Sequence, residues 1–236
     1  NEPDSTIQSF VVSMTEAMAA INRREYIDAR LLLDSATDYF DLGMFLPFYA
    51  IASMKENDSA RLEDYLESLQ TANLQKFAKN PTKDGVYFSE FVTKAVISAF
   101  EGMHDDAIEL LRRAAADVPW SDEQWIYPRY VLSEVGRILF EETGDEQYRY
   151  FTVGFARTSA VYQPYMAYNH AFIAMMSNDR EERVTALARV LTLDPQSRSI
   201  SKANEDELAA AIKLAEEGYP MPPNSSLDDL SAGLAR

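Results

Sequence analysis

The chain has 236 residues, of which 47% are hydrophobic and 25% charged, values typical of a globular protein with a sizeable core. Its formal net charge of −16 favours solubility and disfavours binding to nucleic acid or to an anionic membrane surface. Cysteine is absent, which excludes disulfides, thiolate catalysis and cysteine-ligated zinc. No apolar run is long enough for membrane insertion.

Helical periodicity dominates the chain, and the scarcity of glycine, 8 in 236 residues, also favours helices over an all-β fold. Apolar residues recur every three or four positions in residues 10–23 and 26–37, which predicts two amphipathic helices joined by a short polar break. Residues 42–54 and 60–69 repeat this arrangement around a polar turn. Residues 70–87 predict a long loop with one short helix at residues 74–78.

The best-formed pair of helices is expected in residues 89–119. A helix at 91–100 is followed by a turn and a second helix at 106–117, which Pro119 ends. A capping box at residues 121–124 precedes a helix that is kinked or begins again at Pro128 and runs to about Glu142. Further helices are expected at residues 146–162, 165–176, 180–193 and 204–217, and a weak helical piece at 227–234.

Small and large residues recur at fixed places in these helix pairs, and equivalent positions such as Ala29 and Ala107 lie two periods of roughly 34 to 40 residues apart. The pattern consists of Ala17, Ala29, Leu33 and Ala36 in the first pair, Ala95, Gly102, Ala107, Leu111, Ala114 and Pro119 in the middle pair, and Ala171, Leu187, Val190 and Pro195 in the last. It resembles the tetratricopeptide repeat (TPR) family, in which small residues let paired helices approach closely. Asp41 replaces a proline of the family pattern, and Arg183 replaces a small residue.

The resemblance implies an all-α fold, a right-handed α-solenoid of about five TPR-like helical hairpins with a C-terminal capping helix. Three segments are expected: an N-terminal lead over residues 1–8, the repeat array over residues 9–197, and the capping helix with a proline-containing tail over residues 198–236. One hairpin cannot bury its own apolar face, so stacking of neighbours would complete the core.

The resemblance also implies that the first helix of each pair lines a concave face. The expected lining is Met14, Met18, Ile21, Ile51, Met54, Val96, Phe100, Tyr165, Tyr168, Phe172 and Met175. This apolar, methionine-rich face would suit an apolar peptide, a helix or a lipid-like ligand. Ordinary core packing, or a groove filled by the chain's own C-terminal helix, explains the same residues. The charged clamp with which some members of the family bind acidic C-terminal peptides is missing from these positions.

Residue patterns typical of catalysis are missing from the sequence. His104 and His170 have no partner at metal-binding spacing, and neither a Gly-x-Ser-x-Gly turn nor a glycine-rich phosphate loop occurs. Acidic runs such as residues 145–146 and 179–182 fall at helix starts, where carboxylates cap helices, and lack the spacing of a calcium loop. We therefore expect no catalytic residue, metal or cofactor. Trp120, Trp125 and Tyr127 indicate either packing around a kinked helix or a patch for a partner.

These features favour a protein–protein interaction scaffold or adaptor that binds a peptide or helix through an apolar concave groove, rather than an enzyme. The alternative is a carrier or sensor of a small apolar ligand. The expected partner is a protein or peptide, without nucleic acid and without membrane insertion; the oligomeric state stays open. The polar start at Asn1 favours a mature exported or periplasmic protein over a cytoplasmic one, and a shortened chain would begin in the same way.

Overall fold

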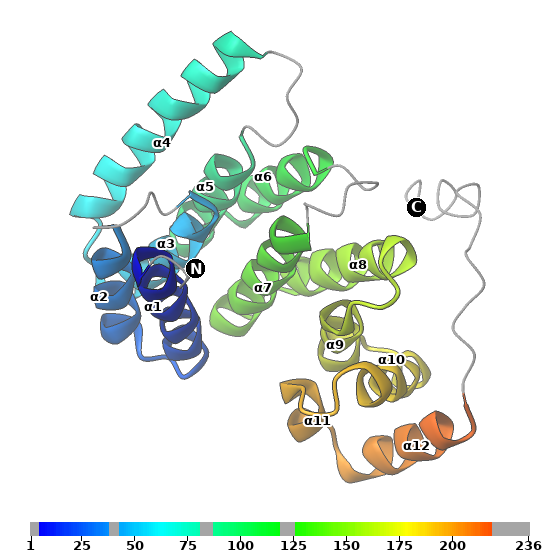
Figure 1. Cartoon of the computed structure of the whole chain (residues 1–236). Helices are drawn as coiled ribbons and strands as arrows, with labels where there is room; N and C mark the ends of the chain where they lie inside the picture. Colours follow the sequence, from blue (N-terminus) through cyan, green and yellow to red (C-terminus); the bar gives the residue numbers. More distant parts are fainter. Residues whose placement is uncertain (1–4, 38–42, 81–86, 119–125, 219–236) are drawn as a thin grey trace. The chain divides into compact units, whose positions relative to one another are not determined.

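The computed structural model describes residues 5–37, 43–80, 87–118 and 126–218. Within these ranges the chain forms twelve α-helices and one 3-10 helix, with no strand, which confirms the all-α fold class (Figure 1). Contacts divide the chain into two compact units, Asn1–Pro119 (unit 1) and Trp120–Arg236 (unit 2). None of the helices in the described residues is long and apolar enough to cross a membrane.

Unit 1 consists of helices that pack as consecutive pairs. They are α1 (Ser5–Asn22), α2 (Tyr26–Thr37), the 3-10 helix η1 (Gly43–Phe45), α3 (Leu46–Glu56), α4 (Ala60–Lys79), α5 (Phe88–Phe100) and α6 (His104–Ala116). Helix α1 packs on α2 and α5 packs on α6, while α3 contacts both α2 and α5. The alanines and leucines of the repeated pattern are 0% exposed in both tight pairs: Ala17, Ala29, Leu33, Ala36, Ala95, Ala107, Leu111 and Ala114. Gly102, in the turn between α5 and α6, is exposed. Small side chains therefore occupy the interior of the pairs, as the spacing predicts.

Unit 2 continues the consecutive pairing. Its helices are α7 (Ile126–Thr143), α8 (Glu146–Tyr162), α9 (Ala167–Met176), α10 (Arg180–Leu193), α11 (Arg198–Lys202) and α12 (Glu205–Glu216). Helix α7 packs on α8, α8 on α9 and α9 on α10; α12 packs on α10, and α11 contacts α9 and α10. Pro128 stands in the first turn of α7, where its missing N–H breaks no helical hydrogen bond, so the helix begins there.

Helix α7 approaches α8 closely at Gly136. A Cβ atom at this position would lie 2.3 Å from the Thr152 hydroxyl oxygen and 3.3 Å from the Phe151 ring. Thr152 is 0% exposed, so its side chain has little room to withdraw. Only glycine fits against Thr152 as the two helices are placed.

The loop predicted for residues 70–87 is wrong over residues 70–73 and 79, because α4 continues as one helix to Lys79. The short helix predicted at residues 74–78 is helical, but as part of α4. Alanine, leucine, glutamine and lysine, all good helix formers, are frequent in this stretch. Asn73 is 1% exposed, and its amide donates to the Glu90 carboxylate on α5 at 3.1 Å, which fixes α4 against α5. Helix α11 was not predicted by periodicity, since five residues are too few to show it.

Other boundaries differ by a few residues, and some expected features lie outside the described residues. Helix α3 begins after the 3-10 turn, and α5 begins three residues earlier than the periodicity predicts. Outside the described residues lie the capping box at 121–124 and the helical piece at 227–234. The same holds for Pro119, Trp120, Trp125 and the side chain of Tyr127.

Helix starts confirm the capping role predicted for two acidic runs. The Asp145 carboxylate accepts the Gln147 N–H at 2.9 Å at the start of α8. Asp179 accepts the N–H groups of Glu181 and Glu182 at 2.9 and 3.4 Å at the start of α10. Each carboxylate therefore satisfies backbone donors that the first helical turn leaves open.

Candidate functional site

The eleven residues predicted to line a concave face lie in different environments. Seven belong to unit 1 and four to unit 2. Buried side chains are Met14, Ile21, Ile51, Val96 and Phe172. Half-buried side chains are Met18, Met54, Phe100, Tyr168 and Met175. Tyr165, which precedes α9, is 71% exposed. A buried side chain can contribute to the fold but offers no surface, so the half-buried ones are the candidates for binding.

Tyr168 and Phe172 of α9 belong to an aromatic cluster with Tyr130 of α7. The Tyr130 ring lies edge-on to Tyr168 at 5.7 Å between centroids and 6.0 Å from Phe172. Burial raises the pKa of Tyr168 to about 12, and the positive charge of Arg129 offsets only part of this effect. This part of the expected lining packs against the core of unit 2.

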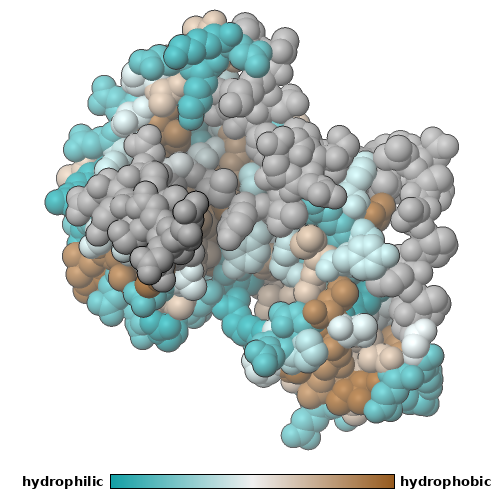
Figure 2. Space-filling model, viewed as in Figure 1, coloured by the Kyte–Doolittle hydropathy of each residue, from teal (hydrophilic) through white to brown (hydrophobic). Residues whose placement is uncertain are grey.

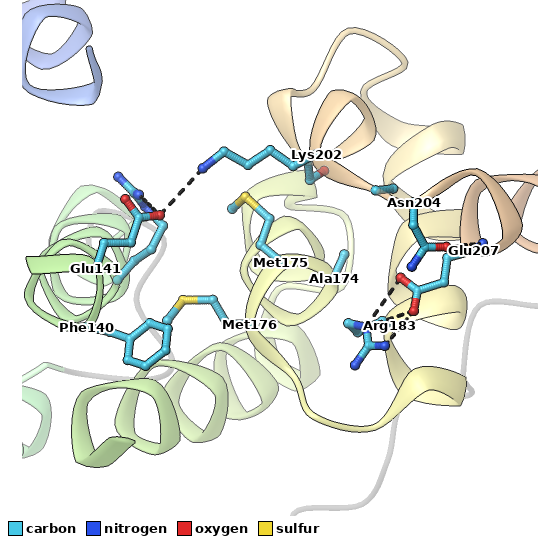
Figure 3. A pocket seen from close by; sticks show the side chains of 12 residues that line it. Phe140, Glu141, Ala174, Met175, Met176, Arg183, Lys202, Asn204 and Glu207 are labelled. Carbon is cyan, nitrogen blue, oxygen red and sulfur yellow. Dashed lines mark hydrogen bonds and ion pairs between the residues drawn. The ribbon is translucent and has the colours of Figure 1, made fainter. Parts of the chain in front are cut away.

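Met175 lines a cavity of about 430 Å³ in unit 2, seen from close by in Figure 3. Helices α7, α9, α10, α11 and the start of α12 form its walls. The apolar lining residues are Phe140, Ala174, Met175, Met176 and Ala203. The polar ones are Arg137, Glu141, Arg183, Ser199, Lys202, Asn204 and Glu207. Hydrophobic residues also gather on the surface over α9 to α12, bordered by hydrophilic ones (Figure 2).

An ion-pair network fixes one side of this cavity. The Arg137 side chain is 3% exposed; its Nε and Nη2 donate to the Glu134 carboxylate at 2.8 and 2.7 Å, and its Nη1 lies 2.6 Å from Glu141. Burial alone would lower the pKa of Arg137, but the hydrogen bonds and charge of Glu134 outweigh it and raise that pKa. Lys202 Nζ lies 3.5 Å from the same Glu141 oxygen, which connects α11 to α7.

Glu141 stays ionised within this network. Burial by itself raises the pKa of Glu141, yet the charge of Arg137, its hydrogen bond and the charge of Lys202 lower it overall. The Glu141 carboxylate thus forms ion pairs with both Arg137 and Lys202, and a dashed line in Figure 3 marks the contact with Lys202.

A second ion pair closes the opposite side, between α10 and α12. Arg183 Nε donates to both Glu207 oxygens at 3.2 and 3.3 Å, and its Nη2 lies 2.5 Å from Oε1. Arg183 Nη1 also donates to the Ser177 carbonyl at 2.9 Å. The hydrogen bond from Arg183 is the main cause that lowers the pKa of Glu207, which is 6% exposed. Arg183 occupies a position where the repeated pattern has a small residue. Its ion pair with Glu207 joins α10 to α12, which accounts for this departure from the pattern.

The charges of the cavity are therefore already matched. Arg137, Arg183 and Lys202 each contact a carboxylate, so none is left to attract an anion. The surface that remains for a ligand is the apolar part around the half-buried Met175, whose flexible thioether adapts to different shapes.

Neither histidine adds a reactive group to this cavity. His170 is 1% exposed, and its Nε2 lies 2.8 Å from the Pro164 carbonyl. Burial is the main cause that lowers the pKa of His170, so the ring is neutral at physiological pH. His104 is the first residue of α6 and is half-buried. The described residues contain no group of three or more His, Asp or Glu side chains that could hold a metal ion.

The sequence did not predict the charged residues of the cavity as site residues, and Arg183 was noted only as a departure from the repeated pattern. Glu134, Arg137 and Glu141 follow one another at spacings of three and four, which places them on one helix face and could have indicated the network. Arg183 and Glu207 are too far apart in sequence for any local signal.

Fold and cavity together define the class: an all-α protein of consecutively packed helix pairs with an ion-paired cavity in unit 2. No protein family, no curated protein and no solved structure matches this chain.

Proposed function

We propose that this protein is a tetratricopeptide-like interaction module whose cavity in unit 2 holds apolar side chains of a peptide or helix from a partner protein. The observation that carries the proposal is the cavity of about 430 Å³ with Met175 in its lining. Its formation from five helices gives it a defined shape, and its matched charges leave an apolar surface as the part available for contact.

The arrangement of the helices supports a hairpin stack within each unit. The first helices of successive pairs contact one another, α1 with α3 and α3 with α5 in unit 1, and α7 with α9 and α9 with α11 in unit 2. Such contacts are what stacking of hairpins requires. The buried small residues of α1/α2 and α5/α6 agree with the same family pattern.

The chemistry of the cavity supports a protein partner. Interfaces commonly combine an apolar centre with a polar rim, and one or two side chains that enter a pocket supply much of the binding energy. The half-buried Phe140 and Met175 offer the apolar centre, and the Glu141–Lys202 contact offers the rim. The function proposed is binding, with no reaction of its own.

Substitution of Met175 by glutamate tests the proposal, because it places a charge in the apolar part of the cavity. Partners captured by the wild-type chain are compared with those captured by Met175→Glu and by Met103→Glu, a matched control at the exposed methionine that precedes α6. We expect a partner that binds the wild type and the control, and whose affinity for Met175→Glu falls about tenfold or more in calorimetry. Equal affinity for a folded Met175→Glu chain, or no partner that depends on Met175, would overturn the proposal.

A carrier of a small apolar ligand is the second candidate, and the cavity volume favours it. Pockets for small molecules have volumes of about 300 to 1,000 Å³, a range that includes this one. Native mass spectrometry distinguishes the two: a carrier retains a mass above that of the polypeptide, which Met175→Glu removes. A bare polypeptide mass together with Met175-dependent peptide binding favours the interaction module.

A further inference from the structure

The C-terminal half of α4 carries an exposed apolar face in unit 1. Among its residues only Leu62 and Asn73 are buried, and every residue from 74 to 80 is exposed. Leu74 is 63% exposed and Phe77 is 42% exposed. Figure 1 shows this end of α4 extending beyond the neighbouring helices of the unit. A core role explains Leu62 and Asn73 but not Leu74 and Phe77.

These side chains continue into an aromatic row at the start of α5, where Tyr87 is the residue before the helix. The Phe77 and Tyr87 ring centroids are 5.9 Å apart, and Tyr87 and Phe91 are 6.0 Å apart. Tyr87 and Phe91 are half-buried. Leu74 and Phe77 are three residues apart on a helix and so share a face. The four residues form one apolar surface, the α4–α5 strip, which unites two helices that are held together by the Asn73–Glu90 hydrogen bond.

The strip lies in a basic part of a strongly acidic chain. The described residues 76–80 and 87–94 include three lysines, Lys76, Lys79 and Lys94, against one acidic residue, Glu90, whereas the whole chain has a net charge of −16. Glu90 is engaged by Lys94 at 2.6 Å and by Asn73. Lys76 and Lys79, on either side of Phe77, are exposed, and no ion pair joins either to a described carboxylate. Their place in the last turn suits the helix dipole, which does not account for the apolar side chains between them.

We propose that the α4–α5 strip is a docking surface for an acidic amphipathic helix of a partner protein. Leucine or aromatic side chains of that helix would cover Leu74, Phe77 and Tyr87, and its carboxylates would pair with Lys76 and Lys79. A protein partner is favoured over nucleic acid or an anionic membrane, because the net charge of −16 repels these extended anions at longer range. A short acidic helix carries few charges and interacts mainly with the nearby lysines, since salt screens the more distant charges of the chain. The surface is separate from the cavity of unit 2.

Selection from a displayed library of random helical peptides tests the proposal with the full-length chain as target. We expect enrichment of peptides that combine Asp or Glu with Leu, Phe or Trp. Their affinities, measured by fluorescence anisotropy, should fall about tenfold or more for Phe77→Ser and for the double variant Lys76→Glu/Lys79→Glu. Peptides in which lysine replaces the acidic residues should show the reverse preference and bind the double variant better than the wild type.

Matched controls come from α12, where Ile212 is 43% exposed and Lys213 is an exposed lysine. Ile212→Ser and Lys213→Glu should leave the affinities unchanged, and so should Met175→Glu, which separates this surface from the cavity. Leu74→Ser is a second variant at the strip that can be used if Phe77→Ser does not fold. Enrichment of basic peptides, binders insensitive to Phe77 and Leu74, or no binders at all would overturn the proposal. So would binding to phosphatidylserine vesicles that the same variants abolish, since it would assign the strip to a membrane.

Discussion

Two helix interfaces, α5 with α6 in unit 1 and α10 with α12 in unit 2, are held together by different chemistry. The first buries Ala95, Ala107 and Leu111 completely. The second has a small apolar cluster that includes Leu187 and Ala211, together with the Arg183–Glu207 ion pair. Close packing of alanines depends on shape alone, whereas an ion pair also depends on pH and salt. The comparison shows that consecutive helix pairing produces both an interface whose stability depends little on pH and salt and one whose stability depends on both.

The largest effect is expected at the shape-dependent interface. Leu111→Ala removes a 0% exposed side chain and should lower the free energy of unfolding by about 3 kcal/mol, because it leaves a cavity among fixed neighbours. Urea denaturation followed by circular dichroism measures the loss. Leu74→Ala, at a 63% exposed position, should change stability by no more than about 0.5 kcal/mol. Similar losses for the two variants would contradict the placement of Leu111.

The next effect concerns the ion pair between α10 and α12. Arg183→Met keeps an apolar stem but leaves the Glu207 carboxylate, 6% exposed, without its main partner. We expect a loss of about 2 kcal/mol, less than for a fully buried pair because the Arg183 side chain is 25% exposed. The double variant Arg183→Met/Glu207→Met should recover most of it in a double-mutant cycle. Additive losses would show that the two residues do not interact.

A pH effect should follow from the ion pairs of unit 2. The pKa of Glu207 and that of Glu141 are lowered below the ordinary value of 4.5 by the ion pairs described above. Burial by itself raises the pKa of Glu182, but hydrogen bonds from Arg157 and Ser177 lower it overall. Each of these groups therefore adds stability above that pH, and the contribution is lost as the pH falls through the folded-state pKa. Hydrogen exchange, corrected for its intrinsic pH dependence, should show α12 losing protection below about pH 4.5 more than α6. The Arg183→Met/Glu207→Met variant should reduce that difference, and an equal loss in α6 would argue against this cause.

The smallest effects are expected at helix starts. Asp179 caps α10, while Met103 at the start of α6 makes no side-chain cap. Asp179→Ala should cost about 1 kcal/mol, and Asp179→Asn should cost much less because an amide oxygen also accepts the N–H groups. Met103→Asp should add up to about 1 kcal/mol by supplying the missing acceptor. Thermal unfolding measures all three, and an Asn variant as unstable as the Ala variant would exclude capping as the reason.

Most of the helices followed from periodicity. Residues 26–37, 146–162 and 180–193 match α2, α8 and α10, since their apolar stripes are regular and polar turns bound them. The extension of α4 was missed because Asn73 looks like a loop residue until Glu90, seventeen positions away, supplies its hydrogen bond. Helix propensity alone could have extended the predicted helix beyond residue 69. The contact between Asn73 and Glu90 could not be predicted from either segment by itself.

The candidate sites were predicted less well than the fold. Met175, predicted as part of a concave face, lines a cavity in unit 2, and the charged residues around it come from α7, α10, α11 and α12, which only the fold brings together. Buried residues such as Ile51 and Val96 have the same spacing as half-buried ones such as Met54 and Phe100. Spacing identifies a helix face, whereas exposure depends on what packs against it.

The close approach of Gly136 to Thr152 has a consequence for how this sequence can change over evolutionary time. An alanine at position 136 fits only after position 152 has lost its hydroxyl group or turned it away, because the two atoms would otherwise stand 2.3 Å apart. The order of the two substitutions is therefore constrained. If Thr152 is first replaced by a residue without a hydroxyl group, alanine at position 136 no longer meets that oxygen atom. If Gly136 is replaced first, the new Cβ atom clashes with Thr152. Related sequences should show these two positions varying together.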